Sequence, residues 1–230
     1  MNNDHPYVIE AKNISKSYQQ GKEKIIVFEN VDFSLKAGEI IALLGPSGSG
    51  KTSFLNILGM LDNPNKGKLS ITGVETIGLS DNKKTALRGK KIGFVFQFHN
   101  LLPDFTALEN VMIPQLIHGI NKEEAKQTAL YILDKMGLAN RIKHFPAMLS
   151  GGEQQRVAIA RSICLKPAII IADEPTGNMD RKTANNVFSM LIELIKETNT
   201  AIILATHDLN IANLIDNKIS LQDKNIQFIS

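Results

Sequence analysis

The feature that most constrains this chain is a run of eight residues at positions 45–52, Gly-Pro-Ser-Gly-Ser-Gly-Lys-Thr. An apolar run of strand length, 39–44, comes before it, and a helical stretch, 51–59, follows it. Glycines at these places let successive backbone N–H groups turn inward around phosphate oxygens, because no Cβ atom blocks the approach. Strand, loop and helix together predict a phosphate loop that binds a nucleoside triphosphate, in preference to a Gly/Ser-rich turn that contains Lys-Thr by chance.

Each part of this loop has an expected contact with the nucleotide. Lys51 is placed to reach the β- and γ-phosphates, and Thr52 is placed to offer its hydroxyl to Mg²⁺. The helix that begins at Lys51 points its positive N-terminal end at the anion. The candidate nucleotide-binding residues of this stretch are Gly45, Pro46, Ser47, Gly48, Ser49, Gly50, Lys51, Thr52 and Ser53.

Size and composition exclude several other classes of protein. The 230 residues suffice for one large α/β domain, or for a core with an inserted subdomain, but not for two full domains. A formal charge of +3 is too small to indicate a nucleic-acid partner. No apolar run approaches the roughly 18 residues that span a bilayer, and residues 1–6 do not resemble a signal peptide, so we expect a cytoplasmic protein. The single cysteine, Cys164, is predicted to be a buried structural thiol.

Two strand ends carry residues suited to phosphate chemistry. The unbroken apolar run 168–172 is typical of a buried parallel strand, and Asp173 and Glu174 follow it. A second apolar run, 200–205, brings His207 to the same edge of the sheet, where the imidazole could reach the γ-phosphate. We expect Asp173 to hold Mg²⁺ and Glu174 to polarise the attacking water, in preference to a solvated turn or a helix cap.

Two further candidates stay open on spacing alone. Gln97 ends the apolar run 92–96, and its amide could bridge Mg²⁺ and the attacking water. Tyr18 sits between two predicted antiparallel strands, 7–11 and 31–35. Its ring could stack on a nucleotide base or cover the sheet, and spacing favours packing against the sheet.

A second helix start carries unusual glycines. Ser150 and Glu153 have the spacing of a capping box that opens a helix running to Cys164. Gly151 and Gly152 weaken its first turn, which makes sense if their unobstructed N–H groups approach a phosphate. Both interpretations remain, and the anion site is the favoured one.

The remaining segments predict packing and interaction surfaces. Residues 98–110 mix aromatic residues with Pro103 and have no clean period, which indicates a loop that carries an interaction surface or packs on the core. Residues 121–137 form a helix with one apolar face, and Asp180 caps another helix. The basic segment 80–91 is predicted to be a solvated helix face rather than a lipid contact.

With these motifs in place, the chain resembles the ATP-binding subunits of ABC transporters over nearly its whole length. The resemblance rests on the phosphate loop, on Leu-Ser-Gly-Gly-Glu at 149–153 and on Asp-Glu-Pro at 173–175, with Gln97 before them and His207 after them. It implies an α/β fold of the P-loop NTPase type in one nucleotide-binding domain, 1–230. This fold would have a mainly parallel core sheet, an N-terminal antiparallel β subdomain and an inserted α-helical subdomain at about 98–165.

The resemblance also implies a role for each matched position, with ATP and Mg²⁺ as cofactors. Tyr18 would stack on adenine, and Asp180 would lie in the loop that communicates across a dimer. Glu174 would be the catalytic base, and His207 would contact the γ-phosphate. The implied catalytic residues are then Glu174, His207, Gln97 and Lys51, and the implied metal-binding residues are Thr52, Gln97 and Asp173.

In such a dimer each ATP site is shared. The resemblance implies that Ser150, Gly151 and Gly152 of one subunit close over ATP held at 45–52 of a second copy, arranged head to tail. ATP binding would close the pair and hydrolysis would reopen it. The pair would drive integral membrane permease subunits from the cytoplasmic face of the inner membrane.

A narrower likeness concerns the cargo. Residues 96–110 and 174–180 look like the ATPase of the lipoprotein-releasing systems of Gram-negative inner membranes, in which lipoprotein cargo is reached only through the permease. Relatives in macrolide-type export and cell division share much of this pattern. Two rivals of other classes are a soluble ABC ATPase of DNA repair or translation, for whose long insert this chain has no room, and a kinase, which would not explain 150–152.

Overall fold

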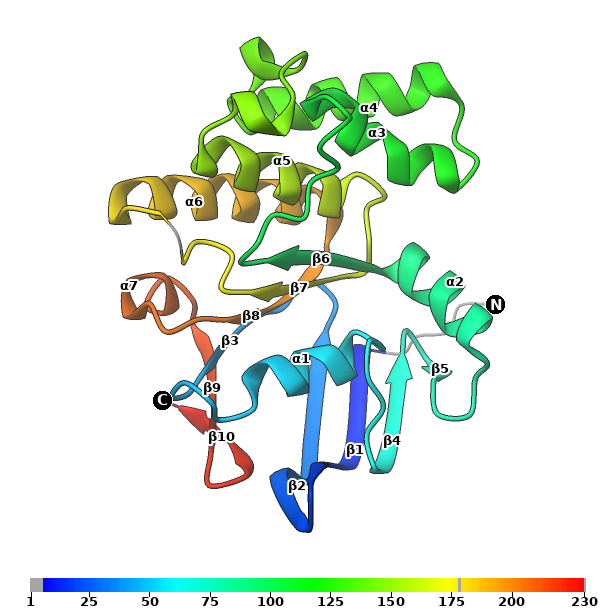
Figure 1. The fold of residues 1–230 in the computed structure, drawn as a ribbon, viewed down its shortest axis with the longest axis vertical. Coiled ribbons are helices and arrows are strands. Elements are labelled where there is room, and N and C mark those ends of the chain that lie inside the picture. Colours follow the sequence, from blue (N-terminus) through cyan, green and yellow to red (C-terminus); the bar gives the residue numbers. More distant parts are fainter. Residues whose placement is uncertain (1–5, 178, 230) are drawn as a thin grey trace.

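Two β-sheets and the helices packed on them make up residues 6–177 and 179–229, the part of the chain that the computed structural model describes (Figure 1). The elements follow in the order β1 (Tyr7–Gln20), β2 (Glu23–Lys36), β3 (Ile40–Leu44), α1 (Lys51–Leu58), β4 (Lys66–Ile71), β5 (Val74–Glu75), α2 (Asp81–Lys91), β6 (Ile92–Phe96), α3 (Ala107–Ile117), α4 (Lys122–Lys135), η1 (Ala139–Arg141), η2 (Pro146–Met148), α5 (Gly151–Ile163), β7 (Ile169–Asp173), α6 (Arg181–Thr198), β8 (Ala201–Ala205), α7 (Leu209–Ala212), β9 (Asn217–Gln222) and β10 (Asn225–Ile229). Among these helices, none is both long and apolar enough to cross a membrane.

The six-stranded sheet brings the predicted site segments to one edge. Its strand order is β10-β9-β3-β8-β7-β6, and only β10 is antiparallel to its neighbour. Leu43, Ala205, Asp173 and Phe96 are successive partners across β3, β8, β7 and β6, so these four strands end level with one another. The polar residues that follow the strand ends therefore meet at the carboxyl edge of the sheet, where α/β proteins bind ligands.

The core strands are apolar on both faces because each face is covered. Consecutive residues of β7, such as Ile170 and Ile171, belong to different apolar clusters. One cluster packs against α3, α4, α5 and α6, and the other packs against α1 and the second sheet (Figure 1). Cys164 is buried in the first cluster, and burial raises the pKa of its thiol to about 12, as expected for a structural thiol.

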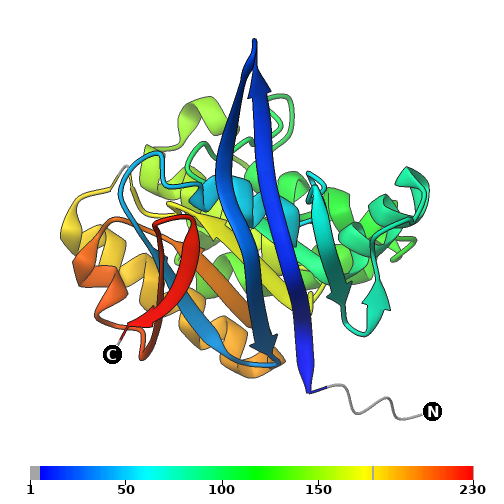
Figure 2. The ribbon, with the colours of Figure 1, turned by 90° about the horizontal axis from the view of Figure 1, so that it is seen from below.

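The second sheet is antiparallel and has the order β2-β1-β4-β5. Its strands β1 and β2 form a long hairpin that reaches well beyond the predicted 7–11 and 31–35 (Figure 2). Tyr18 therefore lies within β1, opposite Ile25, and the prediction that it sits between strands is wrong. The register shifts along β1, and Asn13 has a positive φ of 51°, so the alternation that predicts a strand is interrupted.

The helical layer comes between β6 and β7 in the chain and packs on α6 in one continuous cluster. The predicted loop 98–110 is too long, because α3 already begins at Ala107. Thr106 and Glu109 form a full capping box there, with the Thr106 N–H donating to Glu109 at 2.8 Å. The Thr-x-x-Glu spacing is the sequence signal that would have placed this helix start.

Asn110 holds the preceding loop to α3. Its side chain has an exposed fraction of 0 %, accepts the Leu102 N–H at 2.8 Å and donates to the carbonyl oxygens of Leu102, Phe105 and Thr106 at 3.1, 2.9 and 3.0 Å. Both the oxygen and the nitrogen of this amide are thus hydrogen-bonded to the backbone of residues 102–106.

We expect Asn110→Ala to lower the free energy of unfolding by about 2–3 kcal/mol, because it leaves several buried backbone groups without partners. Urea denaturation followed by circular dichroism measures this loss. The matched control is Asn82→Ala on the exposed face of α2, for which a change within about 0.5 kcal/mol is expected. Equal effects of the two substitutions would contradict the structural role of Asn110.

Candidate active site

The carboxyl edge of the large sheet borders a cavity of about 560 Å³. Its lining residues come from the hairpin, the phosphate loop, α1 and the ends of β6, β7 and β8. They are Tyr18, Val27, Ser47, Gly48, Gly50, Lys51, Thr52, Ser53, Gln97, Asp173, Glu174 and His207. All except Val27 are residues that the sequence predicts for the site, and a cavity of this size is in the usual range for a small-molecule ligand.

The phosphate loop is shaped by its glycines and by Lys51. Gly50 has a φ of 101°, and a Cβ atom there would overlap the Val27 side chain, so only glycine fits. The Lys51 Nζ donates to the carbonyl oxygens of Gly45 and Pro46 at 2.9 and 3.0 Å. The ammonium group thus lies across the loop at the N-terminus of α1, where a bound phosphate would be its stronger partner.

Thr52 and Asp173 provide adjacent oxygen atoms for a hard cation. The Thr52 Oγ1 donates to the Asp173 Oδ2 at 2.8 Å. Burial raises the pKa of Asp173, the Thr52 hydrogen bond opposes this effect, and the nearby Glu174 charge adds to it. These oxygen ligands suit Mg²⁺. Within residues 6–177 and 179–229, no group of three or more His, Cys, Asp or Glu side chains could hold a metal ion. Protein-bound Mg²⁺ commonly combines one or two carboxylates with substrate phosphates and waters.

Glu174 is held by the segment that follows β8. Its Oε1 accepts the His207 backbone N–H at 3.1 Å and lies 2.7 Å from the His207 Nδ1, which donates in the matching tautomer. The side chain of Glu174 is mostly buried, whereas that of His207 is 72 % exposed on the cavity side. Because the Nδ1 of His207 faces the Glu174 carboxylate, the other ring nitrogen, Nε2, points away from it.

Gln97 and Tyr18 line the same cavity but come from different parts of the chain, the end of β6 and strand β1. Gln97 follows the last residue of β6. Tyr18 is 43 % exposed, and its hydroxyl lies 3.2 Å from both the Ser53 Oγ and the Asp62 Oδ2. An exposed ring beside the phosphate loop is a surface on which a base can stack, so the geometry favours that role over simple packing.

The predicted residues 150–152 do not line this cavity. Ser150 caps α5 by accepting the Glu153 N–H, and the Glu153 carboxylate accepts the Ser150 N–H at 2.8 Å. The Arg141 Nε donates to Glu153 at 2.8 Å, and this bond and the Ser150 N–H lower the pKa of Glu153 to about 2. The predicted capping box is present, and Gly151 and Gly152 stand at the positive end of a 13-residue helix.

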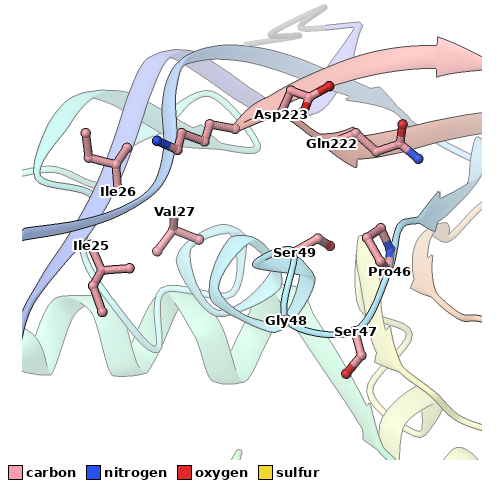
Figure 3. A pocket seen from close by; sticks show the side chains of 10 residues that line it. Ile25, Ile26, Val27, Pro46, Ser47, Gly48, Ser49, Gln222 and Asp223 are labelled. Atoms are coloured by element: carbon pink, nitrogen blue, oxygen red, sulfur yellow. The ribbon is translucent and has the colours of Figure 1, made fainter.

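A second cavity, of about 520 Å³, also borders the phosphate loop (Figure 3). It is lined by Ile25, Ile26 and Val27 of β2, by residues 46–49 of the phosphate loop, and by residues 222–224 at the end of β9 and in the turn to β10. A Cβ atom on Gly45 would lie 2.8 Å from the Leu221 carbonyl oxygen, so the end of β9 packs directly on the loop. Sequence reasoning missed this support, because a contact between residues so far apart in the chain leaves no local signal.

The fold and the site together define a phosphate-loop nucleoside triphosphatase. The chain belongs to the ABC transporter family, whose family model matches residues 28–177. It is an ATP-binding and ATP-hydrolysing protein of this family, and the predicted fold class is confirmed.

Individual relatives cover almost the whole chain. The chain is similar to the lipoprotein-releasing system ATP-binding protein LolD of Bordetella pertussis, with 44% identity over 98% of this chain and 97% of the relative. The protein of the same name from Nitrobacter hamburgensis is 46% identical over 95% of this chain and 94% of the relative. Among solved structures, the dimeric post-hydrolysis state of the ATP-binding cassette MJ0796 bound to ADP and Pi has a TM-score of 0.88 and 41% identity, covering 95% of this chain and 96% of that chain.

Proposed function

We propose that this chain is the ATP-hydrolysing subunit of a membrane complex that releases lipoproteins from the inner membrane toward the outer membrane. The observation that carries the enzymatic part is the single cavity shared by the phosphate loop, the Thr52–Asp173 pair and the Glu174–His207 pair. The lipoprotein-releasing part is supported by relatives of that name that are 44% and 46% identical over nearly the full chain.

The chemistry is divided among the lining residues. We assign phosphate binding to residues 45–53, through the Lys51 side chain and the backbone N–H groups of all but Pro46, and base stacking to Tyr18. Thr52, Asp173 and Gln97 would hold Mg²⁺, which neutralises charge on the β- and γ-phosphate oxygens when bound.

Two residues of the cavity act on the reaction itself in this proposal. The Glu174 carboxylate accepts a proton from the attacking water, and His207 contacts the γ-phosphate. Glu174 follows β7 directly and is hydrogen-bonded by His207, so both side chains are oriented from the same sheet edge before any ligand binds.

A second copy of the chain completes the site. Ser150, Gly151 and Gly152 carry a helix N-terminus suited to an anion but lie outside their own chain's cavity, so we propose that they meet the γ-phosphate held by a partner copy. The dimeric state of a 41% identical ATP-binding cassette supports this arrangement. Residues 98–165 would then form the inserted helical subdomain, and Asp180 would lie in the loop that communicates across the dimer.

The contact with the permease subunits is proposed to involve residues 98–110. Phe98 is 75 % exposed, and Leu102 and Phe105 are also exposed, so an apolar surface faces outward beside Gln97. Packing of this segment on its own core explains why Asn110 is buried, but it does not explain why these three apolar side chains are exposed. Docking here would place the protein peripherally at the cytoplasmic face of the inner membrane.

Purification from native membranes tests the function. The chain carries an affinity tag, inner membranes are solubilised in mild detergent, and co-purifying proteins are identified by mass spectrometry. Integral membrane subunits that release lipoproteins in a reconstituted assay would support the proposal. Capture of a macrolide-type exporter or of cell-division membrane proteins would favour those alternatives, and capture of no membrane protein would favour a soluble ABC ATPase.

Phe98→Glu is expected to reduce recovery of the membrane subunits by about tenfold or more, since a buried interface aromatic residue contributes about 2 kcal/mol or more. The ATPase activity of the isolated chain should be unchanged, because Phe98 does not line the active-site cavity. The matched control is Phe228→Glu on β10, where the side chain is 79 % exposed. Normal recovery with Phe98→Glu would contradict docking through 98–110.

A further inference from the structure

A lysine of β1 is buried directly behind the base-stacking candidate. The side chain of Lys16 is 8 % exposed, and its Nζ lies 2.6 Å from the Asp62 Oδ2 and 3.0 Å from the Asn63 carbonyl oxygen. The same ammonium lies 4.8 Å from the centroid of the Tyr18 ring. A buried ammonium is costly unless it is paired, and here a carboxylate, a carbonyl oxygen and an aromatic face all surround it.

Tyr18 is fixed at both its face and its hydroxyl. Lys16 covers one face of the ring, and the hydroxyl lies 3.2 Å from Ser53 and 3.2 Å from Asp62. Tyr18 is still 43 % exposed and borders the nucleotide cavity, so the part of the ring that Lys16 does not cover is available to a base bound there. The ring is therefore a one-sided surface for stacking.

The same contacts join this ring to the helix that begins at the phosphate loop. Ser53 lies in the first turn of α1, and Asp62 follows the end of α1. The segment after α1 is bound to β1 by further hydrogen bonds, from the Asn65 N–H to the Ser15 carbonyl oxygen at 2.8 Å and from the Ser17 N–H to the Asn65 Oδ1 at 2.6 Å. The distance between the ring and the phosphate-binding N–H groups is thus set by both ends of one helix.

The Asp62 carboxylate is ionised in this cluster. Burial opposes its ionisation, but hydrogen bonds from Lys16, the Asn63 N–H and Tyr18 outweigh burial and lower the pKa of Asp62 below its usual value. Lys12, on the same strand, also forms an ion pair, with Glu10 at 2.8 Å, but its side chain is exposed. Burial is therefore not a general feature of the paired lysines of β1.

We propose that Lys16 and Asp62 are positioning residues for ATP binding, which hold Tyr18 at a fixed place relative to the phosphate loop so that the nucleotide base stacks on its open face. This inference rests on the proposed stacking role of Tyr18. It implies that Lys16 affects only ligands that carry a base, and that it affects different purine bases equally because it contacts none of their edges.

The test compares Mg²⁺-ATP with Mg²⁺-tripolyphosphate, which has the phosphates but no base. Binding of both ligands is measured by calorimetry for the unmodified chain, Lys16→Met, Tyr18→Ala and the double variant. Lys16→Met is expected to weaken ATP binding about three- to tenfold and GTP binding by the same factor, with tripolyphosphate binding unchanged. The double variant should bind ATP no more weakly than Tyr18→Ala, because Lys16 acts through the ring.

Two control variants and three outcomes make the test decisive. Lys12→Met should change nothing, and Lys16→Arg should keep most of the ATP affinity because it retains a cation over the ring. If Tyr18→Ala binds ATP normally, the stacking role itself fails. If Tyr18→Ala weakens ATP binding and Lys16→Met does not, or if Lys16→Met weakens tripolyphosphate binding as much as ATP binding, the stacking role stands and the positioning role of Lys16 is overturned.

Discussion

Glu174→Gln is expected to lower ATP turnover about 10³-fold while ATP binding is retained, because the carboxamide keeps the size of the side chain and removes the general base. The glutamine oxygen can still accept the His207 N–H that Glu174 accepts at 3.1 Å, so the local structure should persist. Phosphate release measures turnover, and size-exclusion chromatography with and without ATP measures pairing. We expect the variant to elute as an ATP-dependent dimer, since the pair closes on ATP and hydrolysis no longer reopens it.

The control is Glu193→Gln on α6, an exposed carboxylate outside the cavity, which should keep normal turnover. Normal phosphate release by Glu174→Gln would mean that another group takes the proton from water. Loss of ATP binding together with turnover would instead indicate that Glu174 holds the site in shape.

Ser150→Arg is the second substitution with a large expected effect. Turnover should fall about 10²-fold or more, because an arginine side chain would obstruct the N-terminal N–H groups of α5 that are proposed to meet the γ-phosphate. ATP affinity of the single chain should stay the same, since residues 150–152 do not line that chain's own cavity. Steady-state phosphate release and calorimetry at low protein concentration measure the two quantities separately.

Ser80→Arg is a matched control, because Ser80 also precedes a helix, α2, but makes no side-chain capping bond and lies away from the site. It should leave turnover unchanged. A drop in single-chain ATP affinity with Ser150→Arg would contradict the assignment of Ser150 to the partner's site.

Local sequence signals predicted the part of the fold that carries the chemistry. The run 39–44, the phosphate loop and the following helix appear as β3 and α1 nearly residue for residue, because a short apolar strand, glycines of special φ and a helix start are each local. Asp173, Glu174 and His207 are brought together because parallel strands of equal length end level at one edge. Their meeting with Gln97 and Lys51 in one cavity follows from that topology.

What the sequence could not predict depends on contacts between distant segments. Register shifts along β1 obscure the full length of the hairpin in the sequence. For the same reason the sequence predicts Tyr18 outside a strand, although it lies within β1. Lys16 is a polar residue on a strand, and nothing near it in the chain reveals that Asp62 and the Tyr18 ring enclose it. The start of α3 differs, because the Thr106–Glu109 capping box is a local signal, whereas the aperiodic aromatic residues before it indicate a loop.

Each ATP site is proposed to be built from the phosphate loop of one copy and from residues 150–152 of another. The most direct test uses the Glu174→Gln background to trap ATP, with Lys51→Ala in one tagged copy and Ser150→Arg in a differently tagged copy. Pairs that contain both tags are captured, and their bound ATP is counted. The shared site predicts that mixed pairs form in ATP and retain one ATP molecule each, whereas neither variant alone forms a pair. Failure of the two variants to pair, or mixed pairs that retain no ATP, would contradict it.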